Sequence, residues 1–242
     1  MALFFFVRYI VDNDTTILDL DDQDIKDDGA TALATALQGN TTLTYLHLGA
    51  NNIGDDGATA LAMALLVNTT LTSLNLGVNN IGNDGATAIA TALHGNATLT
   101  HLNISSNNVG DEGAAAIATA LHVNTTLINL DLHFNNIEED GATSIATALQ
   151  VNTTLRSLGI KYNNVGDEGI MREIDMKLQR NVDLYDAMFW QPACHSDFPP
   201  GLHDLLVATL LCNDGVGEKK LPRLPLVVWQ QVFSFYYRKI FL

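Results

Sequence analysis

Leucine recurs along this chain at a fixed interval of 28 residues. In LTYLHLGANNI, which runs from Leu43 to Ile53, leucine alternates with polar residues, and this alternation predicts a short strand. In GATALAMAL, from Gly57 to Leu65, apolar residues lie at positions i, i+3, i+4 and i+7, and this spacing predicts a helix. Each interval therefore predicts one strand followed by one helix.

Three series of residues keep this interval through the chain. They are Leu18, Leu46, Leu74, Leu102, Leu130 and Leu158; Gly29, Gly57, Gly85, Gly113, Gly141 and Gly169; and Asn40, Asn68, Asn96, Asn124 and Asn152. Six copies run from Thr15 to Asn181, and the last copy is expected to be one residue longer. A fixed interval of this length indicates a solenoid of stacked repeats. We therefore expect an N-terminal cap in residues 1–14, repeats in 15–181 and a helical C-terminal cap in 182–242.

The conserved polar positions of the interval also predict structure. Asp55 and Asp56 open the helix, where carboxylates favour the positive end of the helix dipole. Gly57 lets that helix pack closely against its neighbour, and Asn68 predicts a left-handed cap at the helix end. A further series follows each strand by three residues and predicts a ladder of stacked amides, namely Asn51, Asn79, Asn107, Asn135 and Asn163.

These residues carry a family resemblance. The pattern L-x-x-L-x-L-x-x-N-x-[IV], followed by G-x-x-G-A and an alanine-rich helix, resembles the ribonuclease-inhibitor class of leucine-rich repeats. The segments LTSLNLGVNNI and LINLDLHFNNI match it closely, and the resemblance covers residues 15–181. It implies an α/β fold, a curved leucine-rich-repeat solenoid or horseshoe with a parallel concave sheet and outer helices. It implies no chemistry, because a fold does not fix a function.

Charge is distributed unevenly along the chain. Residues 1–170 hold 19 acidic and 4 basic side chains, and residues 171–242 hold 8 of each, so the net charge of −15 lies on the repeats. An acidic surface repels phosphate backbones, so we expect a neutral or basic protein partner and no nucleic acid. No stretch is long and apolar enough to predict a membrane span. The N-terminal segment MALFFFVRYI lacks the features of a signal peptide, and Cys194 and Cys212 form no disulfide framework, so we expect a cytoplasmic location.

Catalytic, cofactor and metal sites are not expected. The recurring GDDG and GDEG segments place two carboxylates before a helix, whereas a calcium loop alternates its ligands and ends in a bidentate glutamate. The histidines of the strand segments have no predicted nucleophile or carboxylate held beside them, and solvated surface histidine is the simpler interpretation. We therefore predict a protein that is not an enzyme.

The outward strand positions vary while the core positions repeat. A uniform frame that carries varied side chains is typical of a recognition surface in solenoid proteins. Aromatic residues are common anchors of interfaces, so Tyr45, Phe134 and Tyr162 are predicted as anchors. The full set predicted to bind a partner is Tyr45, His47, His101, Asp131, His133, Phe134, Lys161 and Tyr162. The alternative is a solvated surface whose residues have drifted without a binding role.

The C-terminal segment leaves two hypotheses open. LPLVVWQQVFSF resembles the opening of an F-box, a motif by which ubiquitin-ligase receptors bind their adaptor. That resemblance implies a substrate receptor that contacts a ligase adaptor through residues 221–242. The simpler prediction is a helical cap over the last repeat. Repeats this uniform also resemble those of some amoeba-dwelling bacteria and large viruses, which implies, as a further alternative, an effector in the cytoplasm of a host cell.

Overall fold

The computed structural model describes the backbone of residues 15–189 and the side chains of residues 15–185. The chain divides into two compact units, Met1–Val182 and Asp183–Leu242, and the fold below is that of the first. The expected N-terminal cap in residues 1–14 lies outside the described residues, as does the expected C-terminal cap in residues 182–242 from residue 190 onward.

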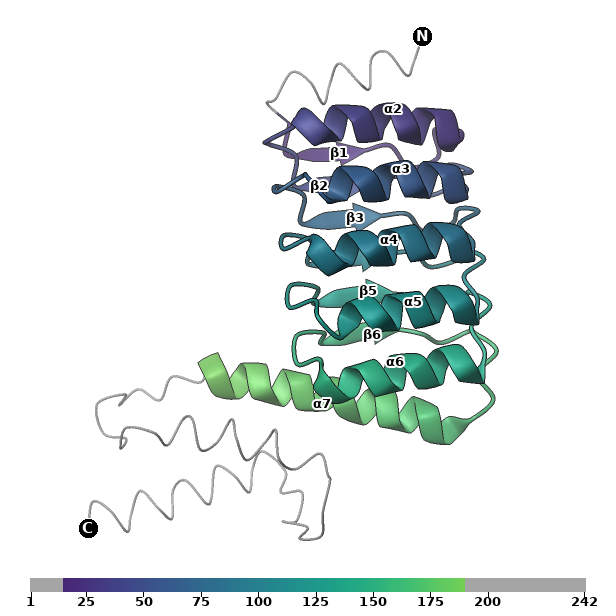
Figure 1. The fold of residues 1–242 in the computed structure, drawn as a ribbon, viewed down its shortest axis with the longest axis vertical. Coiled ribbons are helices and arrows are strands. Elements are labelled where there is room, and N and C mark those ends of the chain that lie inside the picture. The colour runs from purple at the N-terminus through teal and green to yellow at the C-terminus, as the bar shows by residue number, and fades with distance from the viewer. Residues whose placement is uncertain (1–14, 190–242) are drawn as a thin grey trace, which may run out of the picture. The chain divides into compact units, whose positions relative to one another are not determined.

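Strands and helices alternate along the repeats, as the leucine and alanine patterns predict (Figure 1). The strands are β1 Ile17–Asp19, β2 Tyr45–His47, β3 Ser73–Asn75, β4 His101–Asn103, β5 Asn129–Asp131 and β6 Ser157–Gly159. The helices are α2 Lys26–Gly39, α3 Asp55–Leu65, α4 Asn83–Gly95, α5 Asp111–Leu121, α6 Glu139–Val151 and α7 Glu168–Phe189.

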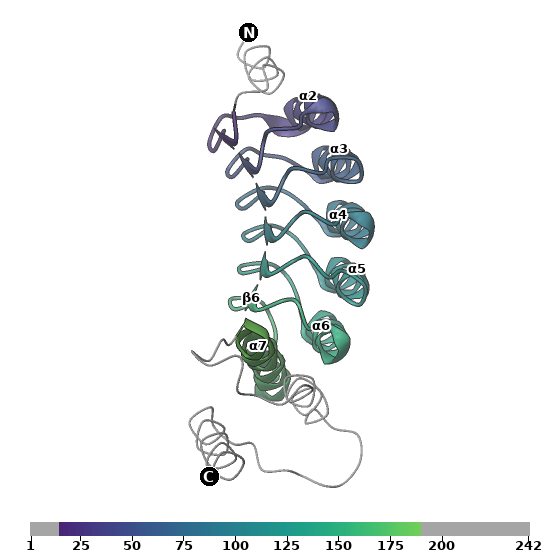
Figure 2. The same cartoon turned by 90° about the vertical axis from the view of Figure 1, so that its left-hand side faces the viewer.

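The strands form one parallel sheet in the order of the sequence, β1-β2-β3-β4-β5-β6. Leu74 pairs with Leu102, and the equivalent leucines pair along the whole sheet, which is the predicted register. Figure 2 shows the strands in one column and helices α2 to α6 in a second column beside it. The predicted α/β leucine-rich-repeat solenoid is thereby confirmed.

The core lies between the sheet and the helices. Leu74 and Leu102 are only 1% and 2% exposed, and the leucines, isoleucines and alanines of the helix stripes complete the same apolar cluster. Glycine is needed where each helix approaches the preceding repeat. A Cβ atom at Gly85 would lie 2.7 Å from Asp55 Oδ1 and 2.9 Å from Ile81 Cγ2, which is closer than real Cβ contacts allow.

The predicted amide ladder is present. The side-chain oxygen of Asn79 accepts hydrogen bonds from the backbone N–H groups of Asn51 (3.0 Å) and Ile53 (2.9 Å). Its amide nitrogen donates to the carbonyl oxygens of Leu48, Leu76 and Gly77. One buried side chain therefore satisfies backbone groups of two successive turns, which a buried turn requires.

Asp55 and Asp56 lie in the first turn of α3, as predicted, and Asp55 also bonds to the start of the next helix. Asp55, the first residue of α3, accepts hydrogen bonds from the N–H groups of Gly82 (2.7 Å) and Gly85 (2.8 Å) at the start of α4. Asp27, Asn83 and Asp111 make the equivalent pairs with the repeats that follow them. At these four junctions, each repeat therefore completes the helix N-terminus of the next, where free N–H groups need acceptors.

The asparagines at the helix ends do not adopt the predicted left-handed conformation. Asn96 has φ −78° and ψ 127°, which is extended backbone, and Asn68 has no positive φ. The Asn96 amide instead donates to the carbonyl oxygens of Leu65 and Asn68 in the preceding repeat, over 2.8 and 3.4 Å. These asparagines form a second ladder. Each amide satisfies helix-end carbonyl oxygens of the preceding repeat, so the asparagine backbone can stay extended instead of turning left-handed.

Residue 181, the predicted end of the repeats, lies inside helix α7, which continues to Phe189. Arg180, 28 residues after Asn152, takes the next ladder place. Its guanidinium donates to the carbonyl oxygens of Leu149 and Asn152, both over 2.7 Å, while Asn181 adds bonds to this end of the ladder.

Candidate protein-interaction surface

The strand-side face consists of the outward side chains of β1 to β6 and of the turns that follow them. Parallel pairing in one register aligns equivalent side chains in straight rows across the sheet. One row holds Tyr45, Ser73, His101, Asn129 and Ser157, and the next holds His47, Asn75, Asn103, Asp131 and Gly159. The predicted rows are confirmed, and they place varied polar and aromatic groups on one face.

Each turn after a strand holds a left-handed residue at the same place in the repeat. These residues form a column, and their φ values are 58° for Asp22, 54° for Ala50, 56° for Val78, 52° for Ser106, 53° for Phe134 and 61° for Tyr162. The N–H group of Phe134 donates to the carbonyl oxygen of Lys161 in the following turn over 3.2 Å, and the earlier turns are linked in the same way. L-residues rarely adopt this conformation, so bonds between turns hold it.

The last two members of this column form a stacked aromatic pair. The rings of Phe134 and Tyr162 have centroids 4.3 Å apart and planes inclined by 8°. The imidazole of His133 lies at a tilt to both rings, with centroid distances of 6.5 and 6.1 Å. We call His133, Phe134 and Tyr162 the aromatic patch. Phe134 and Tyr162 remain 54% and 69% exposed although their rings are in contact, so the pair offers apolar surface to the solvent.

A carboxylate fixes the histidine of this patch. Asp131 Oδ1 lies 2.6 Å from His133 Nδ1 and also accepts a hydrogen bond from the His133 backbone N–H over 2.9 Å. Gly159 leaves room for this pair, because a Cβ atom there would overlap the His133 ring and lie 2.6 Å from Asp131 Oδ1. Gly159 is therefore part of the site, although it carries no functional group.

The opposite end of the face is acidic. Asp19, Asp21, Asp22 and Asp24 are all exposed there, and we call them the acidic end. The ammonium group of Lys26 lies 2.8 Å from Asp24 Oδ2, and this hydrogen bond lowers the pKa of Asp24 below its ordinary value. The Asp21 carboxylate accepts a hydrogen bond from the N–H of Gly49 over 2.6 Å.

One group in the described part of the chain has donor atoms close enough to hold a metal ion. Ligand atoms of Asp19, Asp21 and His47 lie within 4.8 Å of one another. Both carboxylates are exposed and His47 is half-buried, and exposed acidic groups often gather without a metal. We assign no metal to them.

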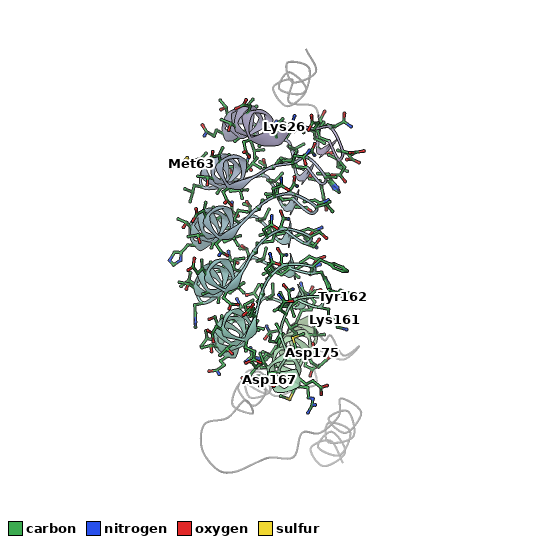
Figure 3. The ribbon with its side chains drawn as sticks, turned by 90° about the vertical axis from the view of Figure 1, so that its right-hand side faces the viewer. Lys26, Met63, Lys161, Tyr162, Asp167 and Asp175 are labelled. Carbon is green, nitrogen blue, oxygen red and sulfur yellow. The ribbon has the colours of Figure 1, made fainter. Side chains whose placement is uncertain are left out.

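The structure brings together five of the predicted partner-binding residues and separates the other three. Asp131, His133, Phe134, Lys161 and Tyr162 lie on β5 and on the turns after β5 and β6. Tyr45 and His47 lie on β2, and His101 lies on β4, on the same face. Their binding role stays a prediction. Figure 3 shows Lys161 and Tyr162 on the strand side and Met63 on the helix side.

Sequence reasoning missed Gly159 and the left-handed column. An alignment of the chain against itself at 28 residues places positions 22, 50, 78, 106, 134 and 162 in one column. It does not reveal their left-handed backbone, because their residue types share no turn signature.

The fold and this surface define a leucine-rich-repeat protein-interaction module. Residues 6–139, more than half of the chain, match the family model described as the TMOD/LMOD leucine-rich domain. Residues 151–172 match a leucine-rich-repeat model. The chain therefore belongs to the TMOD/LMOD leucine-rich domain family.

Two solved structures illustrate the similarity. The structure of leiomodin-1 actin-binding site 2 is 26% identical, with a TM-score of 0.51, over 74% of this chain and 88% of that chain. The tropomodulin C-terminal domain of Caenorhabditis elegans is 13% identical, with a TM-score of 0.50, over 76% of this chain and 95% of that chain, and it supports the fold alone. No curated protein sequence matches the chain significantly.

Two further expectations concern the F-box resemblance and membrane-spanning helices. The F-box resemblance and the adaptor contact of residues 221–242 lie outside the described residues and stay predictions. Among residues 15–189, no helix combines the length and the apolar character that a membrane crossing requires.

Proposed function

We propose that the chain is a non-catalytic protein-interaction module that binds its partner through the strand-side face. The observation that carries this proposal is the stacked pair of Phe134 and Tyr162, which stays exposed on a face that is otherwise mainly polar. Aromatic anchors contribute much of the energy of protein interfaces, because they bury a large area with little loss of side-chain entropy.

The surroundings of the pair suit an interface. Interfaces place an apolar centre inside a polar rim that provides hydrogen bonds and charge. Here the rings form the centre, while the Asp131–His133 pair and Lys161 supply polar groups beside it. The inter-turn hydrogen bond from Phe134 to Lys161 holds the backbone below the rings, so little ordering is needed on binding.

Actin is the partner that we propose to test first. The chain belongs to the TMOD/LMOD leucine-rich domain family, and the name of the leiomodin-1 structure describes that protein's segment as an actin-binding site. The similarity to that structure covers most of both chains, so a shared mode of binding is a reasonable working hypothesis.

Binding of the full chain to actin monomers by calorimetry and to filaments by co-sedimentation tests the proposal. A double variant, Phe134→Asn with Tyr162→Asn, removes both rings and places at each turn a residue that tolerates positive φ. We expect its affinity to fall at least about tenfold, since hot-spot anchors are typically worth more than 1 kcal/mol each.

Met63→Thr is the matched control on the helix side. Met63 is 60% exposed, and the equivalent positions of α2, α4, α5 and α6 hold Thr35, Thr91, Thr119 and Thr147. We expect this variant to bind like the unaltered chain. Loss of binding in Met63→Thr but not in the double variant would overturn the strand-side assignment, and failure of the unaltered chain to bind either form would reject actin.

A further inference from the structure

Two neighbouring columns of the strand-side face change in chemical character along the stack. The first column holds Asp21, Gly49, Gly77, Ser105, His133 and Lys161, and the second holds Asp22, Ala50, Val78, Ser106, Phe134 and Tyr162. Both columns begin with carboxylates in the first repeat. Both end with aromatic or basic side chains in the fifth and sixth repeats.

We infer that the partner contributes a bipolar segment, with a cluster of lysine or arginine at one end and an apolar or aromatic residue at the other. The basic cluster lies over the acidic end, and the apolar residue packs on the aromatic patch. This inference rests on the proposed function, because it assumes that Phe134 and Tyr162 anchor the partner, and it adds the chemistry and the direction of what binds there.

Charge complementarity selects this occupant. Residues 1–170 carry the whole net charge of −15, so their field attracts a basic segment from solution. Asp19, Asp21 and Asp22 keep exposed carboxylates at the acidic end. Lys26 instead lies in an ion pair with Asp24. A second copy of this chain would bring an equal negative charge and is disfavoured, and an acidic segment would be repelled at the acidic end.

The spacing of the strands sets the length of the segment. Adjacent parallel strands lie roughly 4.8 Å apart. Asp22 is therefore about 19 Å from Phe134, four repeats away, and about 24 Å from Tyr162, five repeats away. An extended chain advances roughly 3.3 Å per residue, so about six or seven residues must separate the basic cluster from the apolar residue.

Synthetic peptides with a fluorescent label test this inference on the full chain. Each peptide carries three lysines, a Gly-Ser spacer and one tryptophan, and the spacer is roughly three or roughly eight residues long, below or above the required span. A third peptide has the long spacer and three glutamates in place of the lysines. Binding is followed by fluorescence anisotropy in the presence of EDTA, so that no metal bridges the peptide to Asp19, Asp21 or His47.

We expect the long lysine peptide to bind at least about tenfold more tightly than the short one, because only the long peptide engages both ends at once. Its affinity should fall as salt is raised. In the variant Asp21→Asn with Asp22→Asn, the long and short lysine peptides should bind with equal affinity, and that affinity should depend much less on salt. The variant keeps a side-chain oxygen at position 21 that can accept the N–H of Gly49.

The outcomes separate this inference from the proposed function. One outcome keeps the aromatic anchor and rejects the bipolar segment. In it, the peptides lose binding in the Phe134→Asn and Tyr162→Asn variant, whereas spacer length, salt and the aspartate variant do not alter their affinity. Equal affinity for the lysine and glutamate peptides also rejects the bipolar segment. If neither pair of substitutions alters peptide binding, or if no peptide binds, the bipolar segment is rejected, while the proposed function is decided separately by the actin measurements.

Discussion

The guanidinium of Arg180 donates to the carbonyl oxygen of Asn152 over 2.7 Å, at the place where earlier repeats supply an asparagine amide. The same nitrogen reaches the carbonyl oxygen of Leu149 over 2.7 Å, and a second guanidinium nitrogen reaches that of Gln150 over 3.0 Å. Arginine carries more donors than asparagine. One side chain therefore satisfies the end of α6 as well as the last position of the ladder.

Arg180→Ala should lower the free energy of unfolding by about 2–3 kcal/mol, because it leaves buried carbonyl oxygens without donors. Arg172→Ala on the same helix is the control. Arg172 pairs with Glu168 over 2.7 Å, but both side chains are exposed, and exposed ion pairs contribute little. Urea denaturation of both variants measures the difference, and equal losses would contradict this role for Arg180.

Asn79→Asp should be among the most damaging single substitutions in the repeats. It replaces a buried amide that donates to the carbonyl oxygens of Leu48, Leu76 and Gly77 by a carboxylate that faces the same oxygens. We expect a loss of at least about 3 kcal/mol at neutral pH. Asn80→Asp, at the exposed neighbouring position, should have little effect.

The pH dependence of Asn79→Asp provides an independent check. The folded state disfavours the charged form of the new carboxyl, so its pKa there should lie above the value in the unfolded chain. The destabilisation should then be complete above the folded-state pKa and should shrink as the pH falls through it. A defect that stays constant between neutral pH and about pH 5 would argue against a buried carboxylate.

Gly85→Ala should destabilise the protein by about 1–3 kcal/mol, although alanine favours helix. The added methyl group would lie 2.7 Å from Asp55 Oδ1 and 3.1 Å from Ala58 Cβ, so the stacked repeats would have to separate. Gly39→Ala is the control, because a Cβ atom there meets nothing within 4 Å. The control should melt at the same or a slightly higher temperature.

Val78→Asn should raise the free energy of unfolding by about 1 kcal/mol. Val78 holds φ 56° in the left-handed column and is 60% exposed, so the substitution relieves backbone strain with little loss of burial. Val123→Asn is the control, since Val123 is similarly exposed but has no positive φ. A gain in both variants would point to surface polarity rather than to backbone strain.

The repeating part of the fold could be predicted because each of its contacts recurs. Leu74 and Leu102 fix the register, since a shift by one residue would turn the leucines toward solvent. Asn79 could be assigned to a ladder because a polar residue that recurs beside an apolar core needs partners in its neighbours. The strand register and the amide ladder were both predicted from the 28-residue period alone.

The features that were not predicted depend on contacts between repeats, which the sequence of one repeat does not show. The bonds from Asp55 to the next helix were not predicted, because the sequence alone does not show which helix starts lie side by side. Arg180 was not recognised, because arginine bears no resemblance to the asparagine that it replaces. In the candidate site, the choice of Phe134 and Tyr162 required only their residue type, whereas their stacking required the left-handed turns.

The bond from Asp55 to the start of the following helix has a consequence for the history of the gene. The four junctions from the first repeat to the fifth are made by equivalent donors and acceptors, so deletion or duplication of a whole 28-residue unit among these repeats rejoins equivalent partners. Unequal recombination between repeats could therefore lengthen or shorten the array without creating an unfolded product. Such events would change the distance between Asp22 and Phe134 in steps of one strand spacing, and the protein could gain a different partner in a single genetic event.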